Sequence, residues 1–235
     1  MTKQTQLIIR QDGTLFVAEC QTGGRGRRGR TWVSPAGSGI WMSLLLRPHI
    51  SPESASMLTL VLAVAMVEAI NEEVKDAKCY VKWPNDIVLN SKKISGTLTE
   101  MSAEMDAIHY VVIGIGINVN TTDFDESIKD MATSIYLETG TKVKRSSIIA
   151  AFSKSFKKYY EAFLETEDLT LLIDRYNELL INKGRTVKVI YANKELIGEA
   201  LGINKDGELI IKTEDGASVA IRAGEVSVRG LYGYV

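Results

Sequence analysis

The most concentrated group of chemically capable side chains lies at residues 23–32, which read GGRGRRGRTW. Four arginines alternate there with glycines: Arg25, Arg27, Arg28 and Arg30. The whole chain carries a formal net charge of only −1, and no acidic residue occurs between Glu19 and Glu53. Arginines neutralise phosphate or carboxylate, and glycines let backbone N–H groups approach an anion closely. The stretch therefore has the composition of an anion-binding loop.

Three interpretations of this loop compete. An isolated Arg/Gly run is most often a solvated surface loop, and arginines on flexible segments also track nucleic-acid backbones. The third interpretation is a site for a small anionic molecule. The run lies between two predicted strands and is tethered at both ends like a lid, and such loops on rigid scaffolds are where binding chemistry concentrates. This placement favours the third interpretation without excluding the others.

Two further motifs point in the same direction. Residues 81–96, VKWPNDIVLNSKKISG, put Lys82 at a strand end before a rigid Trp-Pro corner, although an ordinary hairpin has the same pattern. Residues 113–118, IGIGIN, place Gly114, Gly116 and Asn118 on one face of a strand. A strand face without side chains indicates that something lies against the backbone, either a ligand or a packed helix. Together the three motifs describe a pocket for a nucleotide-like anion.

The elements that must position these motifs follow from periodicity and turn residues. Strands are expected at residues 13–21 and 39–48, and a mostly buried helix at 52–74, with Ser51 as its cap. Short turns then favour an antiparallel meander, followed by two helices. The expected strands are 79–83, 86–90, 94–101 and 108–120, and the expected helices are 146–165 and 168–181.

The texture of the sequence changes after residue 182. Four strand candidates, at residues 185–192, 195–204, 207–216 and 218–230, are separated by Asn-Lys, Lys-Asp-Gly and Asp-Gly turns. Closely spaced strands over about 50 residues are typical of a small SH3-like barrel. We therefore expect an α+β chain with domains at 1–182 and 183–235.

Composition narrows the class of protein. A near-neutral chain argues against bulk nucleic acid as the main partner. Two cysteines, Cys20 and Cys79, and two histidines, His49 and His109, have no metal-ligand spacing and suit a reducing cytoplasm. The apolar stretch 57–70 is shorter than a membrane span, and no targeting segment is visible. We expect a soluble cytoplasmic protein that binds neither metal nor membrane.

At this point the motifs resemble those of a known family. The segments AECQTGGRGRRGRTWVSP, VKWPNDIVLNSKKISGTLTE, GIGINVN and GEVSVRG, in this order, closely resemble the biotin protein ligases. The resemblance runs from about Thr14 to the C-terminus. It implies a mixed β-sheet catalytic domain of the class II synthetase type, followed by an SH3-like domain.

The resemblance also implies a reaction and a site. Biotin and Mg-ATP would give biotinyl-5′-AMP, and the biotinyl group would pass to a lysine of a biotin carboxyl carrier domain, such as that of acetyl-CoA carboxylase. Lys82 and Arg27 would be catalytic. Biotin would contact Gln21, Gly24, Arg25, Gly26, Arg27, Lys82 and Gly96. The nucleotide would contact Arg28, Gly29, Arg30, Trp32, Asn85, Gly114, Gly116 and Asn118. A homodimer is common in the family.

Two departures from the family pattern bear on the expectations. A Ser-Thr-Asn segment that contacts the biotin rings in the family has no clear counterpart, and Thr2 in MTKQTQ is at most its remnant. A winged helix-turn-helix domain is also missing, so no DNA binding is expected. The alternatives are a lipoate or octanoate ligase, which shares the catalytic fold, and a non-catalytic RNA-binding protein that uses the Arg/Gly loop.

Overall fold

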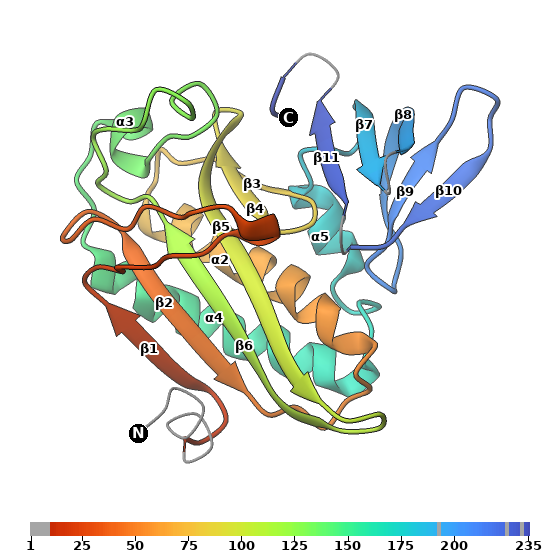
Figure 1. Cartoon of the computed structure of the whole chain (residues 1–235), viewed down its shortest axis with the longest axis horizontal. Coiled ribbons are helices and arrows are strands. Elements are labelled where there is room, and N and C mark those ends of the chain that lie inside the picture. Colours follow the sequence, from red (N-terminus) through yellow and green to blue (C-terminus); the bar gives the residue numbers. More distant parts are fainter. Residues whose placement is uncertain (1–9, 192–193, 224–225, 231–232) are drawn as a thin grey trace.

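The main element of the fold is a six-stranded sheet in the order β1-β2-β6-β5-β4-β3 (Figure 1). The computed structural model describes residues 10–191, 194–223, 226–230 and 233–235. All five pairings in this sheet are antiparallel. A mixed sheet was expected, but the parallel pairing among the described residues consists of two isolated bridges, Val81 to Leu180 and Lys93 to Ala132. The strands are β1 (Thr14–Ala18), β2 (Ile40–Leu46), β3 (Cys79–Lys82), β4 (Asp86–Leu89), β5 (Lys92–Ala103) and β6 (Ile108–Ile117).

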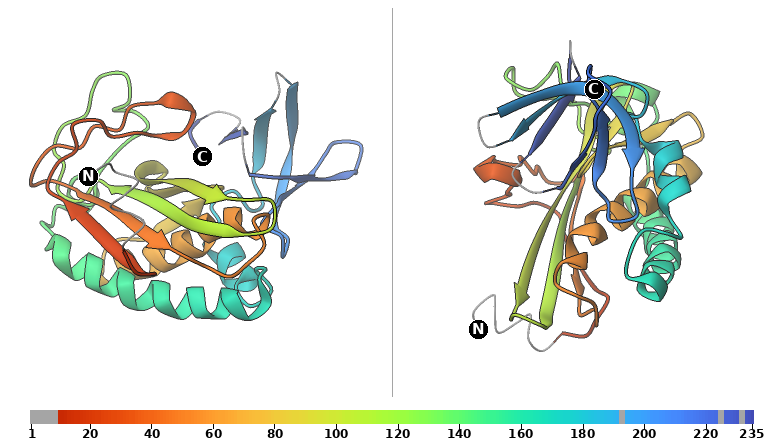
Figure 2. Two further views of the ribbon diagram at one scale, coloured as in Figure 1. Left: turned by 60° about the horizontal axis from the view of Figure 1, so that its bottom comes forward. Right: turned by 90° about the vertical axis from the view of Figure 1, so that its right-hand side faces the viewer.

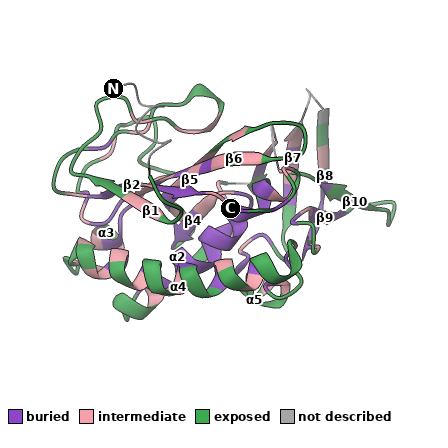
Figure 3. Cartoon of the chain, turned by 90° about the horizontal axis from the view of Figure 1, so that it is seen from below, coloured by how far each residue is buried: buried purple, intermediate pink, exposed green. Residues whose placement is uncertain are grey.

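Two long helices cover one face of this sheet (Figure 2). Helix α2 (Leu58–Glu73), preceded by the short turn η2 (Ser54–Met57), is apolar on nearly all sides and lies in the core. Helix α4 (Arg145–Thr166) is amphipathic and buries Ile148, Phe152, Phe156, Tyr159 and Phe163, while its other side is exposed (Figure 3). The helices therefore form a layer on one side of the sheet and leave the other side open to the Arg/Gly loop.

Helix α2 corrects one expectation from the sequence. Residues 54–73 form a helical stretch that is long and apolar enough to cross a membrane by length and composition, whereas the apolar stretch 57–70, interrupted by Thr59 and Glu68, was predicted to be too short. Most of this stretch is buried inside the fold, and the core helix of a globular protein passes the same test. The helix is accounted for by core packing.

The two shorter helices differ from the sequence prediction. Helix α5 (Ile173–Leu179) begins five residues later than expected, because the Asp168 carboxylate accepts a hydrogen bond from the Thr170 backbone N–H and forms a turn in place of a helix. Helix α3 (Ile135–Thr139) was not predicted. Its Ser134 cap and Gly140, with a φ of 69°, are the signals that could have identified it.

The chain ends in a second, five-stranded antiparallel sheet in the order β10-β9-β8-β7-β11. The last predicted strand, 218–230, is two strands on opposite edges of this sheet, because β10 pairs with β9 and β11 pairs with β7. Within the described residues these edge strands are unpaired with each other, so no closed barrel is formed. The strands are β7 (Thr186–Tyr191), β8 (Lys194–Ile203), β9 (Leu209–Lys212), β10 (Ser218–Ile221) and β11 (Ser227–Gly230).

Trp83 joins the two sheets. Its buried indole Nε1–H donates to the carbonyl of Gly207 at 3.0 Å, and its backbone N–H donates to Asn182 Oδ1 at 3.0 Å. Buried polar groups of this kind are normally paired, and losing one partner leaves the other unsatisfied. The strand end that carries Lys82 is therefore fixed from the C-terminal side.

Changing Trp83 to phenylalanine should destabilise the protein by about 1–3 kcal/mol, because the Gly207 carbonyl loses its donor and the smaller ring leaves a void. Urea unfolding followed by circular dichroism measures this loss. An unchanged unfolding midpoint would show that the indole contributes nothing to joining the two sheets.

Candidate active site

The Arg/Gly segment is an ordered excursion between β1 and β2 that crosses the open face of the sheet (Figure 2). Arg28 and Gly29 form its tip within the short turn η1 (Arg27–Gly29), and both have a positive φ, of 58° and 72°. We call residues 21–34 the arginine loop. Three backbone hydrogen bonds close it, from Gln21 N to Ser34 O, from Trp32 N to Gly24 O and from Gly26 N to Arg30 O, at 3.3, 3.0 and 2.7 Å.

The glycine face of the sheet receives Trp32 from this loop. Gly96 on β5 pairs with Gly116 on β6. A Cβ at Gly116 would lie 2.5 Å from Trp32 Nε1, and one at Gly96 would lie 3.2 Å from the indole ring. Trp32 Nε1 is buried and has no hydrogen-bond partner within the described part of the chain. An orphaned buried donor of this kind indicates a place where a polar ligand can supply an acceptor.

Gly116→Ala should disturb the indole, whereas Gly114→Ala should not. The nearest atom to a Cβ at Gly114 is the Leu98 carbonyl oxygen at 3.6 Å, an ordinary contact. Overpacking costs about 1–3 kcal/mol, so the Gly116 variant should be less stable than the Gly114 variant by about that amount. Urea unfolding followed by tryptophan fluorescence on both variants tests this, and equal unfolding midpoints would show that the indole does not need the bare backbone at Gly116.

Lys82, the predicted catalytic lysine, is buried at the end of β3. Its side chain is 5% exposed, and its ammonium donates to the carbonyl of Val228 on β11 at 3.0 Å. Burial, helped by the positive charges of Lys93, Arg229 and Arg30, lowers the pKa of Lys82 to about 8 against the opposing attraction of Asp86. The groups around Lys82 therefore carry more positive than negative charge, and an anionic ligand would balance the excess.

Asp86 and Lys93 were not predicted as site residues, although both lie in the motif quoted for Lys82. Lys93 Nζ lies 2.5 Å from Asp86 Oδ1, and the two side chains are 25% and 13% exposed. Burial opposes ionisation of Asp86, but Lys93 and Lys82 lower its pKa more strongly. The pairing of Lys93 with a residue seven positions earlier depends on the turn between β4 and β5, which sequence spacing alone does not define.

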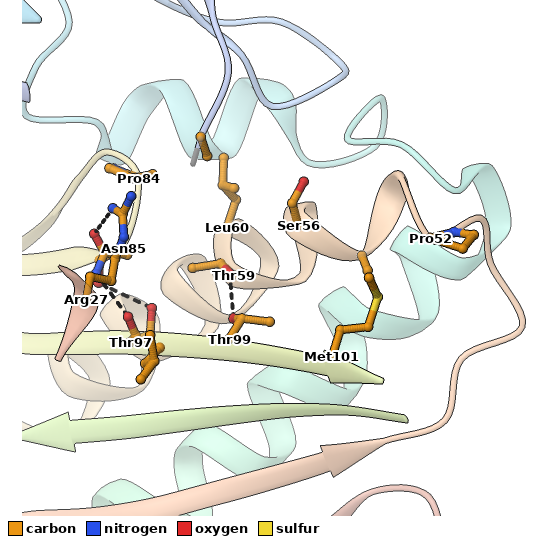
Figure 4. Close-up of a pocket in the computed structure, with 13 residues that line it drawn as sticks. Arg27, Pro52, Ser56, Thr59, Leu60, Pro84, Asn85, Thr97, Thr99 and Met101 are labelled. Carbon is orange, nitrogen blue, oxygen red and sulfur yellow. Dashed lines mark hydrogen bonds between the residues drawn. The ribbon is translucent and has the colours of Figure 1, made fainter. Parts of the chain in front are cut away.

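Arg27 is the arginine that reaches furthest from the loop into the site. Its Nη1 donates to Asn85 Oδ1 at 2.8 Å, and the Asn85 amide donates in turn to the Thr97 carbonyl at 2.9 Å. Burial lowers the pKa of Arg27, and the neighbouring Asp86 opposes that shift. A cavity of about 340 Å³ opens beside this pair (Figure 4). Arg27 therefore links the loop to the Trp-Pro-Asn corner.

The other predicted residues are placed less centrally. Gln21 accepts a hydrogen bond from Ser34 Oγ at 3.3 Å, and a Cβ at Gly24 would meet the Trp32 carbonyl at 2.3 Å. Asn118 is buried and donates to the Thr133 carbonyl at 3.1 Å. Arg25, Arg28, Gly29 and Arg30 are exposed, Gly26 lies under Arg30, and Gly114 is clear of the indole. Thr2 lies outside the described residues.

In the part of the chain that the structure describes, no three His, Cys, Asp or Glu side chains gather closely enough to hold a metal ion. Asp86, the acid nearest Lys82, is engaged by Lys93.

A bare glycine pair, a buried lysine and an arginine loop thus lie on one face of the sheet, an arrangement suited to binding a small anionic molecule. Comparison with known proteins identifies the family. The Biotin/lipoate A/B protein ligase family matches residues 2–118, and the Biotin protein ligase C terminal domain matches residues 184–229. The biotin–[acetyl-CoA-carboxylase] ligase of Paracoccus denitrificans is 31% identical over 91% of this chain and 90% of its own length. The chain belongs to the biotin protein ligase family.

Further relatives agree with this assignment. The bifunctional ligase/repressor BirA of Bacillus subtilis is 42% identical over 87% of this chain and 63% of its own length. The chain thus spans less than two thirds of that relative. The solved structure of the biotin protein ligase from Aquifex aeolicus in complex with biotin and ATP has a TM-score of 0.83 and 32% identity, over 97% of this chain and 95% of that one.

Proposed function

We propose that the chain is a biotin–protein ligase that activates biotin with Mg-ATP and transfers it to a lysine of a biotin carboxyl carrier domain. The observation that carries the proposal is the meeting of Lys82, Arg27 and the Trp32-covered glycine pair at one end of the open sheet face. The match of residues 184–229 to the biotin protein ligase C terminal domain favours biotin over lipoate or octanoate.

In the first step a biotin carboxylate oxygen attacks the α-phosphorus of ATP. The new P–O bond gives biotinyl-5′-AMP, and the bond to the leaving pyrophosphate breaks. Two anions must meet in this step, so positioning and charge stabilisation supply the catalysis. No general base is needed, because the carboxylate is already ionised at neutral pH. Mg²⁺ is part of the substrate Mg-ATP and shares the phosphate charge.

The residues divide between the two ligands. We assign Lys82 to the developing charge between the biotin carboxylate and the α-phosphate, because its ammonium is held by a rigid strand end. Trp32 covers the adenine, and Gly96 and Gly116 leave room beneath it, with Gly114, Asn85 and Asn118 on the nucleotide side. Arg27 closes the loop over the intermediate through Asn85. The remaining loop residues bind as follows: Gln21, Gly24, Arg25 and Gly26 on the biotin side, and Arg28, Gly29 and Arg30 on the nucleotide side.

In the second step the neutral ε-amino group of a carrier lysine attacks the acyl carbon of biotinyl-5′-AMP. An amide forms, AMP leaves, and the amine loses a proton. The relative from Paracoccus denitrificans is named for acetyl-CoA carboxylase, and we propose a carrier domain of that class as the partner.

The same proposal covers the organisation of the protein. We propose a cytoplasmic homodimer in which each chain has a catalytic domain at 1–182 and an SH3-like domain at 183–235.

ATP–pyrophosphate exchange tests the proposed function. The purified chain is incubated with Mg-ATP, labelled pyrophosphate and either biotin, lipoate or octanoate. Exchange that depends on biotin and is at least tenfold weaker with the other acids supports the proposal. Exchange driven by lipoate or octanoate would identify the alternative ligases, and no exchange with any acid would contradict an adenylating enzyme.

A further inference from the structure

The end of the chain enters the site from the C-terminal side. The C-terminus lies between the arginine loop and the five-stranded sheet (Figure 2). Lys82 Nζ is 3.8 Å from the centroid of the Tyr234 ring. The Tyr234 hydroxyl donates to Asp86 Oδ2, and the other carboxylate oxygen, Oδ1, receives Lys93. Tyr234, the penultimate residue of the sequence, thus contacts both the buried lysine and Asp86.

The Tyr234 ring can stabilise the Lys82 ammonium in a way that a second carboxylate could not. An ammonium has three donors, and Lys82 donates to the Val228 carbonyl. A carboxylate against the ammonium would compete with the anionic substrate for the remaining donors. An aromatic face attracts the cation through its ring quadrupole without carrying a charge of its own. The ring can therefore fix the ammonium and leave it available to a carboxylate and a phosphate.

The charged groups that influence Lys82 lie on β4, β5, β11 and the arginine loop. Among the described residues, Asp86 on β4 is the acid that attracts its ammonium, and Lys93 on β5, Arg229 after Val228 on β11, and Arg30 in the arginine loop are basic. Three cations oppose the charged form of Lys82, and the acid is shared between Lys93 and Tyr234. The aromatic ring and the Val228 carbonyl are the neutral groups that favour the ammonium.

We propose that Tyr234 is a positioning residue that holds the Lys82 ammonium charged and correctly placed, with its ring as the active element and its hydroxyl as an anchor on Asp86. This inference rests on the proposed role of Lys82 in adenylation. It makes the C-terminal segment part of the adenylation site, in addition to the Val228 carbonyl that accepts from Lys82.

The test compares Tyr234→Phe, which keeps the ring, with Tyr234→Leu, which keeps an apolar side chain without the ring. Lys82 acts as an ammonium, so activity falls as pH rises through its pKa of about 8. Without the ring the ammonium is less stable, and the fall should begin at lower pH. We expect Tyr234→Leu to lose about tenfold in kcat for adenylation, with its alkaline limb displaced to lower pH and its KM values changed less than about threefold.

Tyr234→Phe should keep the alkaline limb of the wild type and lose about threefold or less in kcat. The matched control is Tyr110→Leu, which also removes a tyrosine ring under a cation, since Arg47 Cζ lies 5.9 Å from the Tyr110 centroid. That control should keep the wild-type profile. Circular dichroism on each variant checks the fold, and the phenylalanine variant decides the question if the leucine variant does not fold.

Four outcomes would overturn the inference: a wild-type rate in Tyr234→Leu, a lower rate with an unmoved pH profile, equal loss in the phenylalanine and leucine variants, or a shift in Tyr110→Leu. The proposed function fails separately, because it predicts biotin-dependent exchange by the wild type. A wild type that exchanges, together with a leucine variant that behaves like it, would reject the role of Tyr234 alone.

Discussion

Lys82→Ala should reduce biotin-dependent ATP–pyrophosphate exchange by at least about 10²- to 10³-fold, the loss expected when one electrostatic donor to a transition state is removed. The ammonium is buried, held by the Val228 carbonyl and preorganised, so water cannot replace it without rearrangement. Lys82→Met, which keeps most of the side-chain volume, should lose as much and separates the missing charge from a packing defect.

Lys78→Ala is the matched control for this prediction. Lys78 is exposed just before β3, the same strand that ends at Lys82, and its removal should leave exchange within about twofold of the wild type. Equal thermal unfolding of the variants would show that the fold is intact. Normal exchange by Lys82→Met would contradict the assignment of the ammonium to the reacting carboxylate and phosphate.

Arg27→Gly should differ from Lys82→Ala, because it should weaken the retention of biotinyl-5′-AMP in the site and not its synthesis. The guanidinium ties the arginine loop to Asn85, and Asn85 is fixed by the Thr97 carbonyl. Losing a hydrogen bond to a charged group weakens closure by roughly tenfold or more. Adenylate synthesis should remain measurable while biotinyl-5′-AMP escapes and acylates accessible lysines. Incubation with an unrelated lysine-rich protein, biotin and Mg-ATP, followed by a biotin blot, measures the escape.

Asn85→Ala removes the acceptor of the same hydrogen bond and should also label the bystander protein above the wild-type level. In the double variant the two effects should not add, because both changes break one contact. Arg222→Gly, at a side chain that is 84% exposed on the C-terminal side, is the control and should label no more than the wild type. Lys82→Ala should label almost nothing. An Arg27 variant that retains its intermediate would show that the loop is held closed by other contacts.

The parts of the fold that sequence predicts well are those with local signals. The periodicity of residues 79–120 defines β3 to β6, and the apolar run after Ser51 defines α2, because each element is long or bounded by strong turn residues. The start of α5 and the division of residues 218–230 into two edge strands were predicted wrongly. A side-chain-to-backbone bond and a change of sheet edge decide those features, and neither has a periodic signature.

The same distinction applies to the site. Lys82, Arg27 and the glycines were predicted as site residues because they lie in compact motifs whose residue types suit an anion. Their roles stay a prediction, whereas the recognition of the family was confirmed. Asp86 and Lys93 were inside one of those motifs but meet only through the β4–β5 turn. Tyr234 carried no signal, because its contact with Lys82 spans most of the chain and depends on how the C-terminal sheet docks.

The most direct test of the central claim is the mass of a purified biotin carboxyl carrier domain after incubation with the chain, biotin and Mg-ATP. The proposed function predicts that one biotinyl group is added to one lysine of the carrier, that the addition requires ATP, and that Lys82→Met abolishes it. A carrier that stays unmodified while the chain is folded and supplied with all three substrates would contradict the assignment of this chain as a biotin–protein ligase.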